Sequence, residues 1–410
     1  MTGAKIRNLA LLTGAIMLAP AIWFAGTAAV PALLRDGAVT RSEAGWLIAA
    51  VQLGFVAGTI TSALLSLADR WPSRALFFGA ASVAGLGTIA QAFIEPAGLG
   101  AYALRFVAGA AMAGVYPVAM KLASGWARAG SSEADRPKGV NPARRQHGDL
   151  GLLIGIVVGA LTIGSAAPHA LPGVLGSVDW RHIYLAAGAL ALVGGALILP
   201  FREGPHTAKR PPFNPRAVLL AWRDPRLRLA NAGYLGHMWE LYAVWAWVGL
   251  FLAQQGVGGD AGILTALVVG SGAIGCVGLG LLADRFNRAR MAAMAMFVSG
   301  ACALLIGGTA GWALPLTLVL AAIWGVSVVA DSAQFSACTS LCAPPELVGT
   351  MLTVQTCAGF LLTVPAIQLM AWAVPALGWA GAFAILGIGP LLGAVAMLRL
   401  APLLPQPSPR

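Results

Sequence analysis

The chain is 410 residues long, and 58% of its residues are hydrophobic while only 10% are charged. A soluble domain needs far more polar surface than this to cover itself, so the composition excludes a soluble globular protein. The formal net charge of +11 would suggest nucleic-acid binding in a soluble chain. The placement of the basic residues along this chain instead favours a role in orienting it in a membrane, as described below.

Apolar segments recur along the whole chain, and each is long enough to cross a hydrocarbon core about 30 Å thick as a helix. These segments are continuously apolar, whereas the strands of a membrane barrel would alternate apolar and polar residues. We therefore predict an all-α membrane protein with twelve transmembrane helices. The predicted spans are 8–33, 44–67, 75–94, 98–124, 149–172, 182–200, 228–253, 261–283, 290–310, 313–341, 348–374 and 379–399.

The basic residues are distributed unequally between the two sides of this topology. With the N-terminus inside, 22 of the 26 Lys and Arg residues lie on the inner side, and only Arg35, Arg41, Arg105 and Arg181 lie on or near the outer side. Inner loops of membrane proteins carry such an excess. We predict a multi-pass protein of the bacterial inner membrane with both termini cytoplasmic. The basic surplus then anchors the chain in the lipid bilayer, and we expect no nucleic-acid partner.

The chain divides into two halves that repeat one plan. The polar segment 201–227, rich in Pro and Arg, separates six spans from six. This pattern predicts an N-terminal bundle over 1–200, a cytoplasmic linker, and a C-terminal bundle over 228–410. Both halves carry Leu-Ala-Asp-Arg between their second and third spans, at 67–70 and 282–285. Two halves in the same orientation fit a parallel repeat about an axis along the membrane normal.

The repeated acidic and basic residues have a physical use at a short turn. An Asp at a helix end can accept from the backbone of a neighbouring helix, while an Arg can pair across the seam between the halves. Membrane anchoring alone explains the Arg residues but requires no Asp at matching positions. We predict a conformational latch made of Asp69, Arg70, Arg74, Asp284, Arg285 and Arg288.

With this repeated loop, the sequence resembles the major facilitator superfamily, whose signature is Gly-x-Leu-Ala-Asp-Arg-x-Gly-Arg-Lys/Arg. The copy from Gly280 to Arg288 matches it well, with Asn287 in place of a glycine, and the first copy matches less closely. Arg105 followed by small residues resembles a fourth-span pattern that is associated with coupling in proton-coupled members. The fifth-span antiporter pattern is incomplete, because Ala160 stands where Pro is expected. The resemblance implies two pseudo-symmetric six-helix bundles, with helices one, four, seven and ten around a central cavity.

Two of the fifteen acidic residues lie well inside predicted spans, Glu240 in the seventh and Asp331 in the tenth. A carboxylate at mid-membrane costs about 2.5–3.5 kcal/mol, so it usually faces a cavity or a partner. With Arg105, both fall on the helices that the resemblance places around the cavity. We predict Glu240, Asp331 and Arg105 as proton-coupling residues. Asp331 could instead cap a broken helix, and Arg105 could hold an anionic group or pair with a carboxylate.

Aromatic and polar side chains near these charges favour a substrate cavity. Packing or an interfacial belt is the simpler explanation for Trp and Tyr residues, but midspan placement argues against a belt. His169 and Gln52 are weaker candidates, since a single buried polar side chain commonly bonds a neighbouring helix. The predicted cavity residues are His237, Trp239, Tyr242, Tyr116, Gln334 and Trp23.

We expect a secondary transporter that moves a small solute, is coupled to protons, and works by alternating access. It would be a monomer and not an enzyme, with no cofactor and no metal site. Gly270, Gly272 and Gly275 spell a dinucleotide-binding pattern, but inside an apolar span they indicate close helix packing.

Two cargoes compete in this prediction. An organic cation or drug exported by antiport fits two acids among aromatic side chains. Uptake of a small organic anion fits Arg105. A non-transporting membrane sensor is the more distant alternative.

Overall fold

The computed structural model describes residues 3–127, 150–175, 179–205, 213–257, 260–283, 286–309 and 313–404. Regular structure in these ranges is helical throughout, without a strand. Backbone groups have no water to bond inside a bilayer, and a helix satisfies them within its own segment. Ten of the described helical segments are long and apolar enough to cross a membrane.

The first half of the chain forms the helices α1 (Gly3–Leu18), α2 (Ala21–Arg35), α3 (Arg41–Leu65), α4 (Leu67–Arg70), α5 (Ser73–Gln91), α6 (Leu99–Met112), α7 (Tyr116–Gly125), α8 (Leu150–Leu175) and α9 (Trp180–Leu197). The predicted linker contains η3 (Pro215–Ala217) and α10 (Leu220–Arg223). The second half forms α11 (Pro225–Ala253), α12 (Ala261–Ala283), α13 (Arg288–Ile306), α14 (Leu314–Ala330), α15 (Ser332–Cys342), η5 (Pro345–Leu347), α16 (Val348–Leu400) and η6 (Ala401–Leu403).

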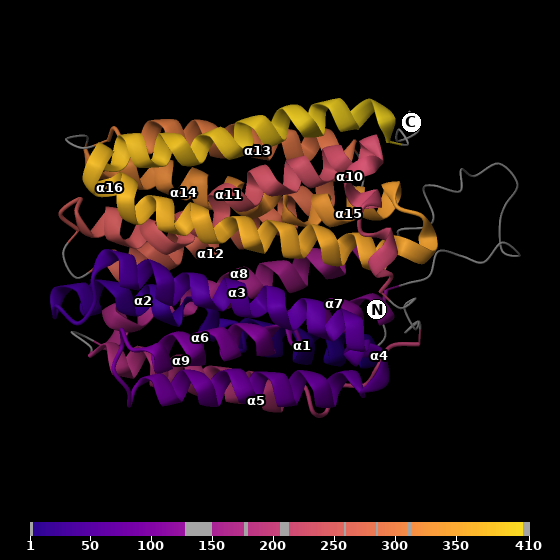
Figure 1. Cartoon of the computed structure of the whole chain (residues 1–410), viewed down its shortest axis with the longest axis horizontal. Coiled ribbons are helices and arrows are strands. Elements are labelled where there is room, and N and C mark those ends of the chain that lie inside the picture. The colour runs from indigo at the N-terminus through magenta and orange to yellow at the C-terminus, as the bar shows by residue number, and fades with distance from the viewer. Residues whose placement is uncertain are drawn as a thin grey trace, which may run out of the picture.

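Two features reconcile the ten apolar segments with twelve spans. The helix α16 is assigned over 53 residues, but Gly378 has a φ of 68°, and the ribbon turns back on itself there (Figure 1). A left-handed φ of this kind suits glycine, which has no Cβ. The helix α11 is 29 residues long but falls outside the apolar set. Counting α11 and both arms of α16 confirms the predicted twelve-helix fold.

Three spans are interrupted where the sequence offers a reason. The first span breaks between α1 and α2 at Pro20, and the fourth breaks just before Tyr116 and Pro117. The tenth breaks at Asp331, between α14 and α15. Proline lacks the N–H that a continuous helix needs, which explains the first two. These breaks all fall on helices expected to line the centre.

The two halves lie side by side and meet along two pairs of helices (Figure 1). The helix α8 packs along α12, and α3 packs along α16. The helix α1 begins and α16 ends at the same end of the bundle, which we call the basic end because Arg7, Arg74 and Arg202 lie there. The other end is the opposite end.

Packing along α8 and α12 differs between the two ends. Nearer the basic end, a Cβ added to Gly155 would lie 3.6 Å from the Cys276 carbonyl oxygen, which is an ordinary van der Waals distance. Near the opposite end, a Cβ added to Gly262 would lie only 2.6 Å from the His169 carbonyl oxygen. The seam is therefore tighter at the opposite end.

Within the first half, glycines bring two helices into direct backbone contact. A Cβ added to Gly54 or Gly58 of α3 would overlap carbonyl oxygens of α6, at Phe106 and Ala110. A Cβ added to Gly109 of α6 would in turn overlap the backbone of α3. Glycine is thus required where these helices touch, as the four-residue spacing indicates.

Candidate functional site

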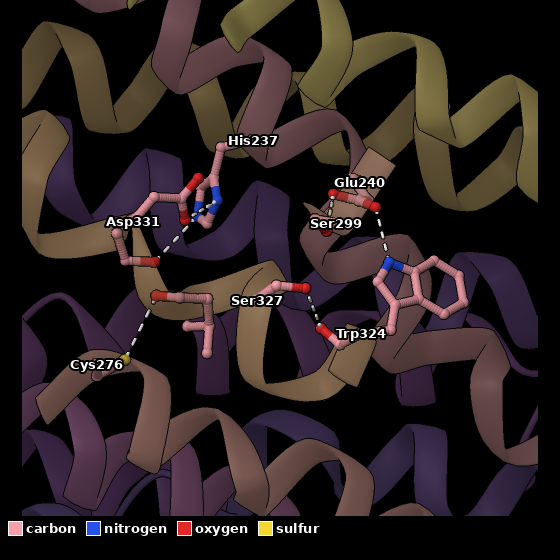
Figure 2. A network of polar contacts seen from close by, with 9 residues as sticks. His237, Glu240, Cys276, Ser299, Trp324, Ser327 and Asp331 are labelled. Atoms are coloured by element: carbon pink, nitrogen blue, oxygen red, sulfur yellow. Dashed lines mark hydrogen bonds and ion pairs between the residues drawn. The ribbon is translucent and has the colours of Figure 1, made fainter. Parts of the chain in front are cut away.

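Glu240 of α11 receives one hydrogen bond from each of two neighbouring helices. Ser299 Oγ of α13 donates to Glu240 Oε2 across 2.6 Å, and Trp324 Nε1 of α14 donates to Oε1 across 2.8 Å (Figure 2). The residue is only 1% exposed. Both oxygens are therefore satisfied, as burial of a carboxylate requires. All three residues belong to the second half.

His237 lies one turn before Glu240 on α11 and forms a second polar cluster with Asp331 and Ser332. Its Nδ1 lies 2.9 Å from Asp331 Oδ1, and its Nε2 lies 3.0 Å from Ser332 Oγ (Figure 2). His237 and Asp331 are each 2% exposed. The Nδ1–Oδ1 contact has an ion-pair distance, yet Oδ1 has no well-aligned hydrogen bond within the described residues. This oxygen retains capacity to accept a further donor.

The break between α14 and α15 places Asp331 in this cluster. Its carbonyl oxygen accepts from Gln334 N across 2.8 Å, but its side chain makes no capping hydrogen bond to α15. The carboxylate turns toward His237 instead. The helix break therefore places the Asp331 side chain against His237. The alternative prediction, in which this side chain caps the broken helix, is wrong.

The two clusters can hold protons in different ways. A Ser hydroxyl can donate to a carboxylate or accept from a carboxylic acid, so the bond between Ser299 and Glu240 survives either state. An imidazole can carry its proton on either nitrogen, so His237 can adapt to either state of Asp331. Both acids can thus gain or lose a proton without losing every partner.

Aromatic side chains from both halves meet where α2 faces α11 and α16. The Tyr242 ring centroid lies 6.0 Å from that of Trp23, 5.8 Å from that of Phe24 and 5.1 Å from that of Phe360. The Phe24 and Trp245 centroids are 5.2 Å apart. We call these five residues the aromatic layer. All are buried, so the layer is closed to solvent in this conformation.

Two buried nitrogens in or next to the aromatic layer lack hydrogen-bond partners within the described residues. They are Trp245 Nε1 of α11, in the layer, and His169 Nε2 of α8, beside it. The Phe24 ring centroid lies 6.3 Å from that of His169 and 5.2 Å from that of Trp245. Buried polar atoms without a partner are uncommon and need an explanation. These nitrogens are candidate contacts for a solute. From the sequence, His169 is only a weaker candidate for the cavity.

Arg105 of α6 is fully buried, and its hydrogen bonds within the described residues all go to backbone oxygens. Its Nη1 donates to Ile22 O across 2.8 Å, its Nη2 to Trp23 O across 2.9 Å, and its Nε to Leu47 O across 3.2 Å. A Cβ at Gly26 would lie 3.2 Å from Nη2, so a glycine makes room for the guanidinium. The group joins α6 to α2 and α3. In the part of the chain that the structure describes, none of its bonds reaches a carboxylate, and Arg105 does not contact Glu240 or Asp331.

Three other predicted cavity residues have separate surroundings. Trp239 Nε1 donates to Ile385 O across 3.1 Å, so this side chain faces the second arm of α16. Gln334 Oε1 accepts from Arg288 Nη1 across 3.2 Å. Tyr116 is the first residue of α7, just after the break in the fourth span, and packs partly buried against the hydrophobic core. Of the predicted cavity set, only Trp23 and Tyr242 lie in the aromatic layer, and His237 pairs with Asp331.

The predicted latch is only partly described. Asp69 Oδ1 accepts from Lys121 Nζ across 2.6 Å, a contact within the first half, between the α3–α5 turn and α7. Arg70 and Arg74 form no ion pair with the described part of the chain. Asp284 and Arg285 lie outside the described residues. Arg288 contacts Gln334, as given above.

Sequence reasoning missed several partners. Ser299 and Trp324 sit in spans that read as ordinary apolar helices, and only their polar atoms at midspan could have marked them. Lys121 looks like one more basic anchor in the sequence but is buried against Asp69. No group of three His, Cys, Asp or Glu residues is placed to hold a metal ion in the described ranges.

Comparison with known proteins places these features in a family. The chain resembles the solved structure of the proton:xylose symporter XylE bound to 6-bromo-6-deoxy-D-glucose, with a TM-score of 0.70 and 14% identity over 96% of this chain and 95% of that one. At this identity the likeness concerns the fold. No curated protein gave a significant match. The family model described as Major Facilitator Superfamily matches residues 11–367, and the chain therefore belongs to that superfamily.

Proposed function

We propose that this protein is a proton-coupled secondary transporter of a small organic solute, working by alternating access between its two halves. The observation that carries the proposal is the pair of buried acids, Glu240 on α11 and Asp331 at the break between α14 and α15. Asp331 contacts His237, which lies one turn before Glu240 on α11. Membership of the superfamily and the likeness to a proton symporter support secondary transport.

The second half would carry the protons. Glu240 and the His237–Asp331 pair are each shielded from solvent in this conformation. A proton-coupled carrier needs such shielding, since a proton site open to both sides of the membrane at once would let protons cross without the solute. Rocking of one half against the other along α8–α12 and α3–α16 would expose the acids to one side at a time. Arg105 would hold the first half rigid rather than bind the proton.

The solute would bind at the aromatic layer. Its rings offer apolar contact, and the unpartnered nitrogens of His169 and Trp245 offer hydrogen bonds. Aromatic faces near carboxylates also suit an organic cation, so drug or cation antiport stays a second candidate. Arg105 is fully buried and each of its three guanidinium nitrogens donates to a backbone oxygen, which weighs against uptake of an organic anion through that residue.

The topology and the latch are part of the proposal. The positive-inside distribution supports placing the basic end in the cytoplasm of a bacterium, and we propose that the protein acts as a monomer. The Asp69–Lys121 contact would stabilise the turn between α3 and α5 in one conformation of the cycle.

The proposal is tested with reconstituted protein in liposomes under an imposed pH gradient. A panel of organic cations, sugars and organic anions identifies a solute whose uptake or release moves protons. Glu240→Gln and Asp331→Asn should then lose proton flux while solute exchange without a gradient persists. Coupled flux that is undiminished in both variants would falsify the assignment of the acids.

A further inference from the structure

A pocket at the basic end is lined by three arginines from three separate segments. It has a volume of about 470 Å³ and is bordered by Arg7, Leu11, Arg74, Pro200 and Arg202. Arg7 belongs to α1, Arg74 to the first turn of α5, and Arg202 to the segment after α9. All three arginines are exposed. The pocket lies where the ends of α1, α5 and α9 come together, since α9 packs against both α1 and α5.

The backbone around this pocket is held in place. Arg202 N donates to the buried side chain of Asn8 across 2.7 Å, and Arg202 O accepts from Trp126 Nε1 across 2.9 Å. Asn8 Nδ2 in turn donates to Ala4 O within α1 across 2.8 Å. These bonds fix the backbone of Arg202 beside α1, next to Asn8, which follows Arg7 in the sequence. The fold therefore holds Arg202 close to Arg7.

The three guanidinium groups contact no acidic side chain among the described residues. Arg7, Arg74 and Arg202 form neither an ion pair nor a side-chain hydrogen bond with the described part of the chain. Glu203 follows Arg202 in sequence but does not line the pocket. Like charges gathered in one pocket repel each other and favour binding of an anion.

We infer that this pocket binds the phosphate headgroup of an anionic membrane phospholipid. Arginine forks bind phosphate oxygens with two parallel hydrogen bonds, and basic pockets between membrane helices hold such headgroups. The pocket lies at the end of spanning helices, where headgroups sit. Leu11 and Pro200 border it, and Ile6, Phe78 and Leu199 nearby are exposed apolar side chains that acyl chains would cover.

A pocket at the opposite end provides the contrast. It has a volume of about 550 Å³ and also contains an arginine, Arg181, but with Glu95 in the same lining. Arg181 Nη1 lies 3.2 Å from Asp179 Oδ2, and its guanidinium carbon lies 4.5 Å from the centre of the Trp180 ring. Its charge is already compensated, so we expect no anionic lipid there.

The test is lipid binding to the full-length protein by native mass spectrometry and by titration in nanodiscs. Phosphatidylglycerol and cardiolipin should bind the unmodified protein in preference to phosphatidylcholine. The triple variant Arg7→Gln, Arg74→Gln, Arg202→Gln should bind them on the order of 100-fold more weakly, since each basic residue near the membrane surface contributes independently. The variant Arg181→Gln is the matched control and should bind as the unmodified protein does.

Three results would overturn the inference. They are equal binding of anionic and zwitterionic lipids, unchanged binding by the triple variant, and binding of soluble glycerol phosphate as tight as that of the lipid. The last result would assign the pocket to a soluble anion. If the triple variant does not run as a monodisperse species, Arg202→Gln alone, with an expected loss of severalfold, replaces it.

Discussion

The two halves of the molecule treat buried charge in opposite ways. In the first half, Arg105 is surrounded by three backbone oxygens of α2 and α3. In the second half, Glu240 and Asp331 are surrounded by side chains from α11, α13, α14 and α15. A backbone oxygen cannot change its protonation or rotate away, whereas hydroxyl and imidazole groups can do one or both. The charge of the first half therefore joins helices through fixed backbone groups, whereas the charges of the second half, to which we assign the proton coupling proposed above, have side-chain partners that can change.

Replacing Arg105 should have the largest effect on stability. Arg105→Met removes three charge-assisted hydrogen bonds that join three helices, and the expected loss is about 3–5 kcal/mol of unfolding free energy. Thermal unfolding of the detergent-solubilised protein measures it. Glu240→Gln is the control, because Gln can still accept from Trp324 and donate to Ser299, and its cost should stay near 1 kcal/mol. Equal destabilisation by the two variants would break the comparison.

Breaking the His237–Asp331 pair should have the next largest effect. His237→Ala leaves Asp331 buried without its main partner, at an expected cost of about 3 kcal/mol. The double variant His237→Ala, Asp331→Asn removes the charge as well and should regain most of that loss. A double-mutant cycle of unfolding free energies measures the coupling. A coupling near zero would mean that the two side chains do not stabilise each other.

Ser299→Ala should have a smaller effect that links stability to transport. It removes one of the two donors to Glu240, with an expected cost of about 1–2 kcal/mol and a severalfold fall in proton-coupled flux. The matched control is Ser327→Ala, because Ser327 Oγ bonds only to carbonyl oxygens of its own helix, at Ile323 and Trp324. If both variants reduce flux alike, Glu240 is not the group affected.

The smallest expected effect concerns the turn between α3 and α5. Lys121→Met removes the ion pair with Asp69. The side chains of Lys121 and Asp69 are 10% and 21% exposed, so the loss of unfolding free energy should be about 1 kcal/mol. The change should alter the balance of conformations, measured as the rate of chemical labelling of single cysteines at the two ends. Arg70→Gln serves as control and should leave the rate unchanged. A latch role for Asp69 fails if neither stability nor labelling responds to Lys121→Met.

The sequence predicts the architecture well because the bilayer leaves few choices. Continuous apolar runs define the spans, and the repeated Leu-Ala-Asp-Arg turn relates the halves. The breaks in the first and fourth spans lie beside Pro20 and Pro117. The span most easily missed by hydropathy is α11, which carries His237 and Glu240 along with the basic residues of its first turns. These polar and charged side chains keep α11 out of the set of apolar segments.

The contacts of the site are harder to predict, for a physical reason in each case. Every residue offers a carbonyl oxygen, so no pattern of side chains indicates that Arg105 bonds to Ile22, Trp23 and Leu47. Whether Trp239 faces the centre or α16 depends on the rotation of α11, which is set by packing that only the folded chain defines.

The uneven seam between α8 and α12 has a mechanical consequence. At Gly155 the helices touch at an ordinary contact distance, so they can separate there at the cost of a few dispersion contacts. At Gly262 the backbone of α8 occupies the space that a side chain would fill, and the two helices interlock. Because α8 and α12 are in backbone contact at the opposite end and less tightly packed toward the basic end, they can rotate apart about the tight contact. We expect the pivot at the opposite end and the first opening movement at the basic end.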